Sequence, residues 1–249
     1  MDISQAFKNI DNKLWKGGVA NALDYMEQSS WILFLKYLSD QEENRLFEAE
    51  LEGKDYQPVF QKQYLWKQWA CKRNKDGTRN NTEDLTGDDL LAFVNDKLFP
   101  YLKSFQTGTE NTHTIENKIG QVFARLDNKI DDGYILRDVL DTVDQLEFGT
   151  EDEHHQFSKL YEERIAQMGN AGRSGGQYYT PRPLIKAIVD VVNPKIGETV
   201  YDPAAGSCGF LVEAYRHIKE NSGELKTKQL EKLELHTLYG KEKIVLPYI

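Results

Sequence analysis

The sequence has little of what secreted, membrane-spanning or zinc-binding chains depend on. Its 249 residues include two cysteines, Cys71 and Cys208, which lie far apart and show no paired spacing or histidine pattern typical of zinc. The densest apolar run, WILFL at 31–35, is far shorter than the roughly twenty residues of a membrane helix. The first residues also lack the basic and then apolar regions of a secretory signal. We therefore expect reduced thiols, no metal site, no membrane span and a cytoplasmic location.

Positive charge is also scarce, and it is unevenly spread. The net charge is −9, which argues against a general, sequence-blind attraction to nucleic acid. Residues 1–165 carry 20 basic and 31 acidic side chains, whereas residues 166–249 carry 11 basic and 9 acidic ones. Any contact with DNA must therefore be local, or must be shared with a more basic partner subunit.

The spacing of apolar residues predicts a mostly helical first half. Residues 18–50 place apolar or small side chains three and four positions apart, which predicts a helix with one apolar face. Leu46 and Leu51 extend this spacing. The members of the face are Val19, Leu23, Met26, Ser30, Leu33 and Tyr37. The same kind of spacing predicts further helices at 88–105, 115–126, 134–146 and 155–168.

Between the helices predicted at 18–50 and 88–105 lies a segment of different character, residues 53–87. It mixes aromatic and basic side chains and holds the turn signal Asp76-Gly77, so we expect an irregular insertion or a loop with short strands. Its part at 64–79 is the best local candidate for contact with DNA or a partner, with a solvated loop as the alternative. The stretch EDEHH at 151–155 holds residue types that bind metals, but a polar surface connector explains it as well.

The second half of the chain alternates strands and helices. Thr180 is placed to cap a helix that Pro181 opens. A strand at 199–202, a helix at 208–220 and a strand at 235–240 follow. This order predicts an open α/β sheet.

Two motifs about twenty residues apart predict a pocket for S-adenosylmethionine: GQYYTPRPL at 176–184 and VYDPAAGSCGFL at 200–211. Four glycines in the eight residues 169–176 lead into the first motif and mark a hinge or a loop that covers a ligand. The second motif runs from a strand through a glycine loop into a helix. Backbone N–H groups can approach a ligand closely in such a loop.

A dinucleotide-binding loop is the alternative for the second motif, because it also places glycines between a strand and a helix. The spacing argues against it, since the sequence has no GxGxxG and Asp202 precedes the glycines. There a carboxylate would repel a pyrophosphate but could accept hydrogen bonds from the ammonium group of an amino-acid moiety. Glu242, at the end of the next predicted strand, could accept from two ribose hydroxyls. Cys208, inside the loop, is expected to serve as a small side chain and not as a nucleophile.

With these motifs the chain resembles the modification (DNA methyltransferase) subunit of type I restriction-modification systems over most of its length. The helical start with WILFLKYLSD at 31–40 is similar to the N-terminal domain of that family. GGQYYTPRPL at 175–184 and DPAAGSCGF at 202–210 match its two cofactor motifs. The resemblance implies that S-adenosylmethionine is bound by Gln177, Tyr178, Tyr179, Thr180, Pro181, Arg182, Asp202, Gly206, Ser207, Cys208, Gly209 and Glu242.

The same resemblance implies a role for each group of residues. Asp202 would hold the methionine ammonium, the loop amides the methionine portion, and Glu242 the ribose. Tyr178 or Tyr179 would form an aromatic wall near the sulfonium, or alternatively would pack between a helix and the sheet. The family transfers the methyl group to the exocyclic amine of an adenine in DNA, which must be flipped out of the duplex into a pocket.

The family's target-base motif, Asn-Pro-Pro followed by Phe or Tyr, is absent from this sequence, so we assign no catalytic residue. The single Asn-Pro, at Asn193 and Pro194, precedes the cofactor loop and is typical of a turn. Pro247 stands where family members continue into a helix, which leads us to expect a truncated chain.

The expected fold is therefore α plus α/β: an N-terminal helical domain at 1–165 that contacts DNA or a partner, and the first part of a Rossmann-like methyltransferase sheet at 166–249. The expected partners are DNA and the specificity and restriction subunits of a type I system. A shortened parallel sheet has an uncovered edge, so we also expect self-association or partial disorder beyond residue 220. The alternative function is a non-catalytic module that binds the cofactor or a partner. A small-molecule methyltransferase is disfavoured by the long helical N-terminal domain.

Overall fold

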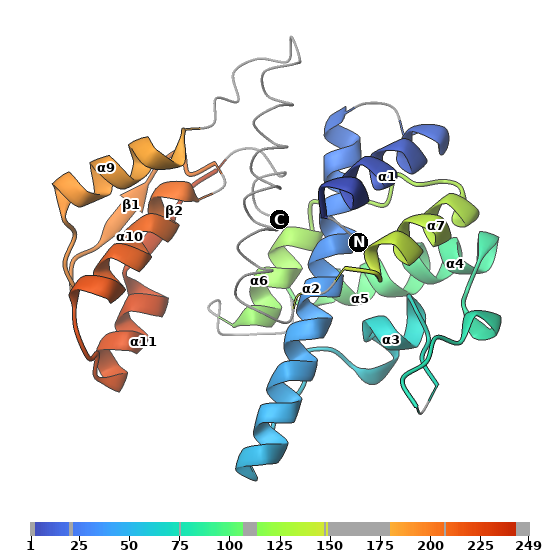
Figure 1. Ribbon diagram of the computed structural model, residues 1–249, viewed down its shortest axis with the longest axis horizontal. Helices are drawn as coiled ribbons and strands as arrows, with labels where there is room; N and C mark the ends of the chain where they lie inside the picture. The colour runs from blue at the N-terminus through green and yellow to red at the C-terminus, as the bar shows by residue number, and fades with distance from the viewer. Residues whose placement is uncertain are drawn as a thin grey trace. The chain divides into compact units, whose positions relative to one another are not determined.

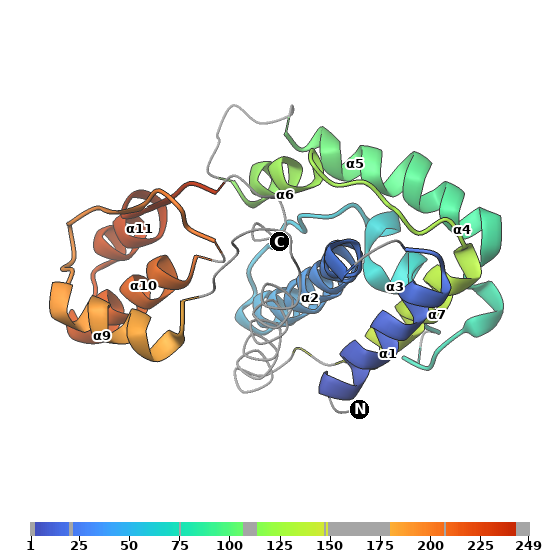
Figure 2. The same ribbon diagram turned by 90° about the horizontal axis from the view of Figure 1, so that it is seen from above.

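The computed structural model describes residues 3–19, 22–74, 76–106, 114–146, 148, 180–206 and 208–242. The chain forms two compact units, Met1–Met168 and Gly169–Ile249, and each is described by itself (Figure 1, Figure 2). Several predicted features lie outside the described residues. They are the domain boundary near residue 165, the helix at 155–168, the polar stretch at 151–155 and the glycines at 169–176.

The described part of the first unit consists of helices and the loops that join them. Its helices are α1 (Ile3–Lys16), α2 (Ala22–Glu52), α3 (Trp66–Trp69), α4 (Gly87–Phe93), α5 (Phe99–Ser104), α6 (Ile115–Phe123) and α7 (Gly133–Val143). Two 3-10 turns, η1 (Lys62–Tyr64) and η2 (Asn81–Glu83), and a π-helical turn, η3 (Val94–Leu98), complete it. The helices predicted at 18–50, 88–105, 115–126 and 134–146 are thereby confirmed, whereas α1 was not predicted.

Aromatic side chains of α2, α5 and α6 form the centre of this unit's core. Trp31 is fully buried, and its ring meets the ring of Phe99 edge-on with centroids 5.2 Å apart. Phe99 meets Phe123 in the same manner at 5.5 Å. The indole N–H of Trp31 donates to Oε1 of Gln28, which also accepts from the backbone N–H of Lys129. These bonds satisfy a polar side chain inside the core and join α2 to the segment that precedes α7.

The apolar face predicted for α2 is buried only along the first part of the helix. Met26 and Leu33 are 0% and 2% exposed, but Leu51 is 72% exposed. The helix continues through Leu51 to Glu52, as the spacing predicts, but the Leu51 side chain is exposed. The last turns of α2 extend beyond the neighbouring helices of this unit, so no core lies beside them (Figure 1).

Buried carboxylates hold the insertion at 53–87 against the helices. Glu42 on α2 is buried and accepts from the backbone N–H groups of Val59 and Phe60. Asp144, directly after α7, has a side chain that is only 7% exposed and accepts from Trp66 Nε1 at 2.9 Å. It also pairs with the guanidinium groups of Arg73 and Arg79.

The described part of the insertion is irregular, with short helical turns, which supports the first of the two predicted alternatives over a loop with short strands. Among its described residues, strand pairing is limited to one isolated antiparallel bridge between Arg73 and Arg79. Arg79 also pairs with Asp84 and Asp141, and Lys67 pairs with Glu43 on α2. The cations of 64–79 are thus largely matched by carboxylates of the same unit, which favours a structural role over DNA contact.

The described residues of the second unit form two short strands and three helices. In chain order these are α9 (Arg182–Val192), β1 (Val200–Asp202), α10 (Gly209–Asn221), α11 (Thr227–His236) and β2 (Leu238–Gly240). The two strands pair in parallel, with Val200 opposite Leu238 and Asp202 opposite Gly240. The predicted alternation of strands and helices, with parallel pairing, is confirmed for the described residues.

Two details of this unit differ from the sequence-based expectations. The strand predicted at 235–240 begins only at Leu238, because α11 continues through His236. Thr180 does not cap α9. Pro181, in an extended conformation, occupies the capping position, and its carbonyl accepts from the N–H groups of Leu184 and Ile185. The turn predicted at Asn193 is confirmed, since Asn193 ends α9 in the left-handed conformation.

No helix in the described ranges is both long enough and apolar enough to cross a membrane.

The Asp144 network predicts a large loss of stability when its acid is removed. Asp144→Ala should lower the free energy of unfolding by about 3 kcal/mol, because it removes the acid paired with Arg73 and leaves the buried indole N–H of Trp66 without its acceptor, while Arg79 keeps Asp84 and Asp141. Glu43→Ala removes an acid from the exposed Lys67 pair and should cost at most about 1 kcal/mol. Urea denaturation followed by circular dichroism measures both values, and equal losses would contradict the assigned role of Asp144.

Candidate cofactor-binding site

The candidate site lies at the carboxyl ends of the two parallel strands. The register of the pair sets Asp202, the last residue of β1, beside Gly240, the last residue of β2. Glu242 follows two residues later, so two carboxylates lie at the same edge of the sheet. Ligands of open α/β sheets bind at this edge, in the crevice outside the carboxyl ends of the strands.

Backbone hydrogen bonds join the loop after β1 to the end of β2. The N–H of Lys241 donates to the carbonyl of Asp202 at 2.9 Å, and the N–H of Ala205 donates to the carbonyl of Lys241 at 3.0 Å. The N–H of Gly206 donates to Oε2 of Glu242 at 2.8 Å. These bonds extend the strand pairing into the loop and hold Glu242 against it.

The Asp202 side chain also shapes the first turn of the loop. Its Oδ1 accepts from the backbone N–H of Ala204 at 3.1 Å, two residues further along the chain. A carboxylate that bonds the backbone in this way favours a tight turn directly after the strand. The half-buried carboxylate is thereby held at the mouth of the loop.

Two glycines allow the loop to take its course. Gly206 has φ +53°, and a Cβ added there would meet no atom within 4 Å, so open space borders the loop at this point. At Gly240 an added Cβ would lie 2.9 Å from Leu211 Cδ1 and 3.1 Å from Ala205 Cβ. A side chain at position 240 would therefore separate the loop and α10 from β2.

Helix α9 lies beside α10 and runs in the same direction. Ile185 near the start of α9 approaches Gly209 at the start of α10, and Asp190 further along α9 contacts His217 with 3.2 Å between Oδ1 and Nδ1. Burial lowers the pKa of the Arg182 guanidinium, and the carboxylate of Glu213 on α10 opposes this effect. The first turn of α9 thus lies within electrostatic reach of the helix that follows the loop.

The thiol of Cys208 is held in its protonated form. Burial raises the pKa of Cys208, and the negative charges of Asp202 and Glu242 raise it further. The residue adopts φ +61° and precedes the first residue of α10. Since the thiolate is the nucleophilic form of cysteine, this environment agrees with the role expected for Cys208, a small side chain in the turn.

The structure brings together most of the predicted site residues that it describes. Asp202, Gly206, Cys208, Gly209 and Glu242 form one cluster at the ends of β1 and β2. Thr180, Pro181 and Arg182 lie at the start of α9. Gln177, Tyr178, Tyr179 and Ser207 lie outside the described residues.

Sequence reasoning missed three residues that shape this cluster. Ala205 and Lys241 act through their backbone groups, so their side chains carry no sign of the role. Gly240 allows the close approach of α10 and the loop. The available signal in the sequence was its position two residues before Glu242, the carboxylate predicted to bind the ribose.

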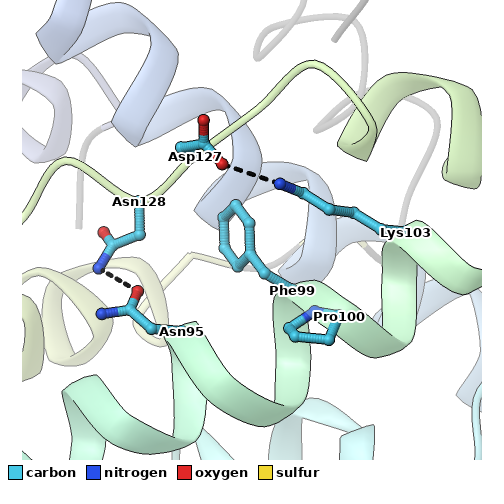
Figure 3. Close-up of a pocket in the computed structure, with 6 residues that line it drawn as sticks. All are labelled: Asn95, Phe99, Pro100, Lys103, Asp127 and Asn128. Atoms are coloured by element: carbon cyan, nitrogen blue, oxygen red, sulfur yellow. Dashed lines mark hydrogen bonds and ion pairs between the residues drawn. The ribbon is translucent and has the colours of Figure 1, made fainter.

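Two hollows in the first unit are alternative candidate sites. The first, about 260 Å³, is lined by Asn95, Phe99, Pro100, Lys103, Asp127 and Asn128. Figure 3 shows that its polar groups pair with one another: Lys103 with Asp127 at 2.8 Å, and Asn128 with Asn95 at 3.0 Å. The second, about 370 Å³, is bordered by Lys67, Lys72 and Arg73, which pair with Glu43, Glu83 and Asp144. Because these groups already have partners, both hollows are poorer candidates than the carboxyl ends of β1 and β2.

Metal-binding side chains do not gather in the part of the chain that the structure describes. No three of its His, Cys, Asp and Glu side chains lie close enough to hold a metal ion.

Comparison with known protein families finds two matches that overlap at residues 152–160. Residues 3–160 match the family described as the HsdM N-terminal domain, and residues 152–248 match the N-6 DNA methylase family. The chain belongs to the HsdM family, the modification subunits of type I restriction enzymes. The expected fold class, a helical N-terminal part followed by the start of a methyltransferase domain, is confirmed. The methylase match runs through residue 248 and so includes the segment around Pro247.

Several HsdM proteins align with this chain over a large part of its length. The EcoEI methylase subunit of Escherichia coli is 36% identical over 250 residues, which cover 100% of this chain and 48% of that protein. The StySPI methylase subunit of Salmonella potsdam is 37% identical over 160 residues, which cover 62% of this chain and 30% of that protein. The chain thus spans about half the length of the EcoEI methylase subunit.

Two solved structures share the fold of this chain. A modification subunit from Vibrio vulnificus YJ016, of a restriction enzyme assigned to type I, has a TM-score of 0.81 at 35% identity; the match covers 100% of this chain and 52% of that one. A chain from a study of complex assembly and conformational transition in a type I R-M system has a TM-score of 0.64 at 33% identity. That match covers 96% of this chain and 46% of the other.

The surroundings of Cys208 predict slow alkylation. Its raised pKa leaves a smaller thiolate fraction at pH 7.5 than in an ordinary thiol, so iodoacetamide should modify it more slowly than a cysteine in an unstructured peptide. The rate should rise as the pH increases beyond the ordinary thiol pKa. Cys71 should react more slowly still, because burial raises its pKa to about 12. Peptide mass spectrometry measures both sites, and a Cys208 rate equal to the reference peptide would contradict this account.

Proposed function

We propose that the second unit binds S-adenosylmethionine at the carboxyl ends of β1 and β2. On this proposal the chain is the cofactor-holding part of an adenine-specific DNA methyltransferase subunit. The observation that carries the proposal is the hydrogen bond from Gly206 N–H to Glu242. It joins the loop after one strand to a carboxylate after the next, beside the carboxylate of Asp202.

The described residues fit the chemistry of this cofactor. A carboxylate at Asp202 suits the methionine ammonium group, and Glu242 can accept from ribose hydroxyls. The open space beside Gly206 leaves room for a ligand to approach the loop backbone. The sequence also places Gln177, Tyr178 and Tyr179 shortly before α9, where the family resemblance implies further contacts with the cofactor.

The chain's own residues bind and orient the cofactor in this proposal. When bound, S-adenosylmethionine supplies the methyl group carried on its sulfonium. The substrate is the exocyclic amine of an adenine, which has to leave the duplex to be reached. The sequence contains no Asn-Pro-Pro motif to receive that base. We therefore expect the 249-residue chain alone, without its specificity subunit, to bind the cofactor without transferring its methyl group.

The proposed partners follow from membership of the HsdM family. They are DNA, a specificity subunit that reads its sequence, and the restriction subunit of a type I system, all acting in the cytoplasm. We propose domains at 1–165 and 166–249, the first for contact with DNA or a partner. The second candidate function, a non-catalytic module that binds cofactor or partner, is favoured by the absence of the target-base motif.

Calorimetric titration with S-adenosylmethionine tests the proposed site. Asp202→Ala should weaken binding about 10- to 100-fold, because it removes a charge-assisted hydrogen bond to the ammonium group. Glu242→Gln should weaken it as well, since the change weakens both the ribose contacts and the bond from Gly206. The control is Glu224→Gln, which alters an exposed carboxylate beyond the far end of α10.

The outcomes of this titration separate the two candidate functions. Wild-type binding that is lost in Asp202→Ala and kept in Glu224→Gln would establish the cofactor site. Methylation of adenine by the chain together with its specificity subunit would then favour the enzyme, and cofactor binding without methylation would favour the module. No wild-type binding would refute the proposed site.

A further inference from the structure

The end of helix α2 exposes two large apolar side chains. Phe47 is 61% exposed and Leu51 is 72% exposed, and they lie one helical turn apart on the same face. Water-exposed apolar side chains that adjoin on a projecting helix are typical of a contact surface. We refer to residues 44–52 as the α2 arm.

Acidic side chains flank this apolar pair. Helical spacing puts Glu50 on one side of Phe47 and Glu48 on the other, while Arg45 falls on the opposite face. The ten residues from 43 to 52 contain four glutamates and one arginine. The face of the α2 arm is therefore an apolar centre with an acidic rim.

The described contacts of α2 with the rest of its unit stop close to where the arm starts. Glu42 is bonded to the insertion, and Glu43 pairs with Lys67. After these residues the described interactions are local: Lys54 donates its backbone N–H to Ala49 and pairs with Glu52. The arm is thus bonded to the insertion at its base, through Glu42 and Glu43, and its last turns expose Phe47 and Leu51.

The negative charge of the α2 arm limits which partners can bind it. Phosphates of DNA would be repelled by the glutamates, and so would a second copy of the same acidic arm. A protein surface with an apolar cleft between lysine or arginine side chains would match both features. A helix that lays its apolar face into such a cleft is a recurring mode of recognition.

We infer that the α2 arm docks into a basic, apolar cleft on the DNA-reading specificity subunit. This inference rests on the proposed function, which supplies that partner. A subunit that reads DNA must carry a basic surface. The arm would bind part of such a surface through Phe47 and Leu51, with Glu48 and Glu50 at the rim.

The test measures binding of the 249-residue chain to the purified specificity subunit by biolayer interferometry. The double variant Phe47→Gln, Leu51→Gln keeps good helix formers and should weaken binding at least tenfold. Glu48→Gln, Glu50→Gln should reduce the dependence of association on salt. Trp15→Gln is the matched control, because Trp15 is 69% exposed on α1 of the same unit, and it should leave binding unchanged.

Three results would overturn the inference. They are no binding by the wild-type chain, equal binding by the wild type and the Phe47, Leu51 double variant, and equal weakening by Trp15→Gln. Loss of self-association in the double variant, with specificity-subunit binding unchanged, would assign the arm to a second copy instead. Titration of the same proteins with S-adenosylmethionine keeps the two proposals apart, because cofactor binding does not involve the arm.

Discussion

The parallel pairing of β1 with β2 is the constraint on which the candidate site depends. Each strand is only three residues long, yet the register decides that Asp202 and Gly240 end side by side. A shift of one residue would turn every side chain of a strand to the other face of the sheet. The loop bonds of Ala205, Gly206 and Lys241 require this register, so the positions of both carboxylates follow from it.

Close packing of helices on this pair maintains the register. Gly240 admits Leu211 of α10 to within contact of β2, and Gly209 admits Ile185 of α9 to the start of α10. Larger side chains at these two glycines would separate the layers. The glycines around the loop therefore act in two ways. Gly206 adopts a left-handed backbone conformation, whereas Gly209 and Gly240 allow neighbouring elements to pack closely.

Charge is used differently in the first unit. Its acidic excess is partly matched internally, where Asp84, Asp141 and Asp144 surround Arg79. Cations of the insertion that are paired in this way are less available to bind DNA phosphates. The glutamates at the end of α2 are instead presented outward beside exposed apolar side chains. The acidity of this unit therefore agrees better with a basic protein partner than with DNA.

Helix spacing and the two cofactor motifs made most of the architecture predictable. The helices at 88–105 and 134–146 and the strand–loop–helix at 199–220 appear in the structure close to their expected bounds. The exposure of Leu51 was not predictable, because periodicity shows which face of a helix is apolar but not where the neighbouring helices end. The start of the strand predicted at 235–240 was placed three residues too early, since the local sequence there allows both a helix end and a strand start. The role of Gly240 depends on tertiary proximity, which one chain's spacing does not reveal.

Photolabelling shows whether the cofactor lies at the loop between β1 and α10. The chain is irradiated with S-adenosylmethionine that carries a labelled methyl group, and tryptic peptides are mapped by mass spectrometry. Cleavage after Lys195 and Arg216 releases residues 196–216, a single peptide that holds Asp202 through Gly209. The account predicts label in this peptide or in the preceding motif at 174–186, displaced by unlabelled cofactor. Label confined to peptides of the first unit would contradict it.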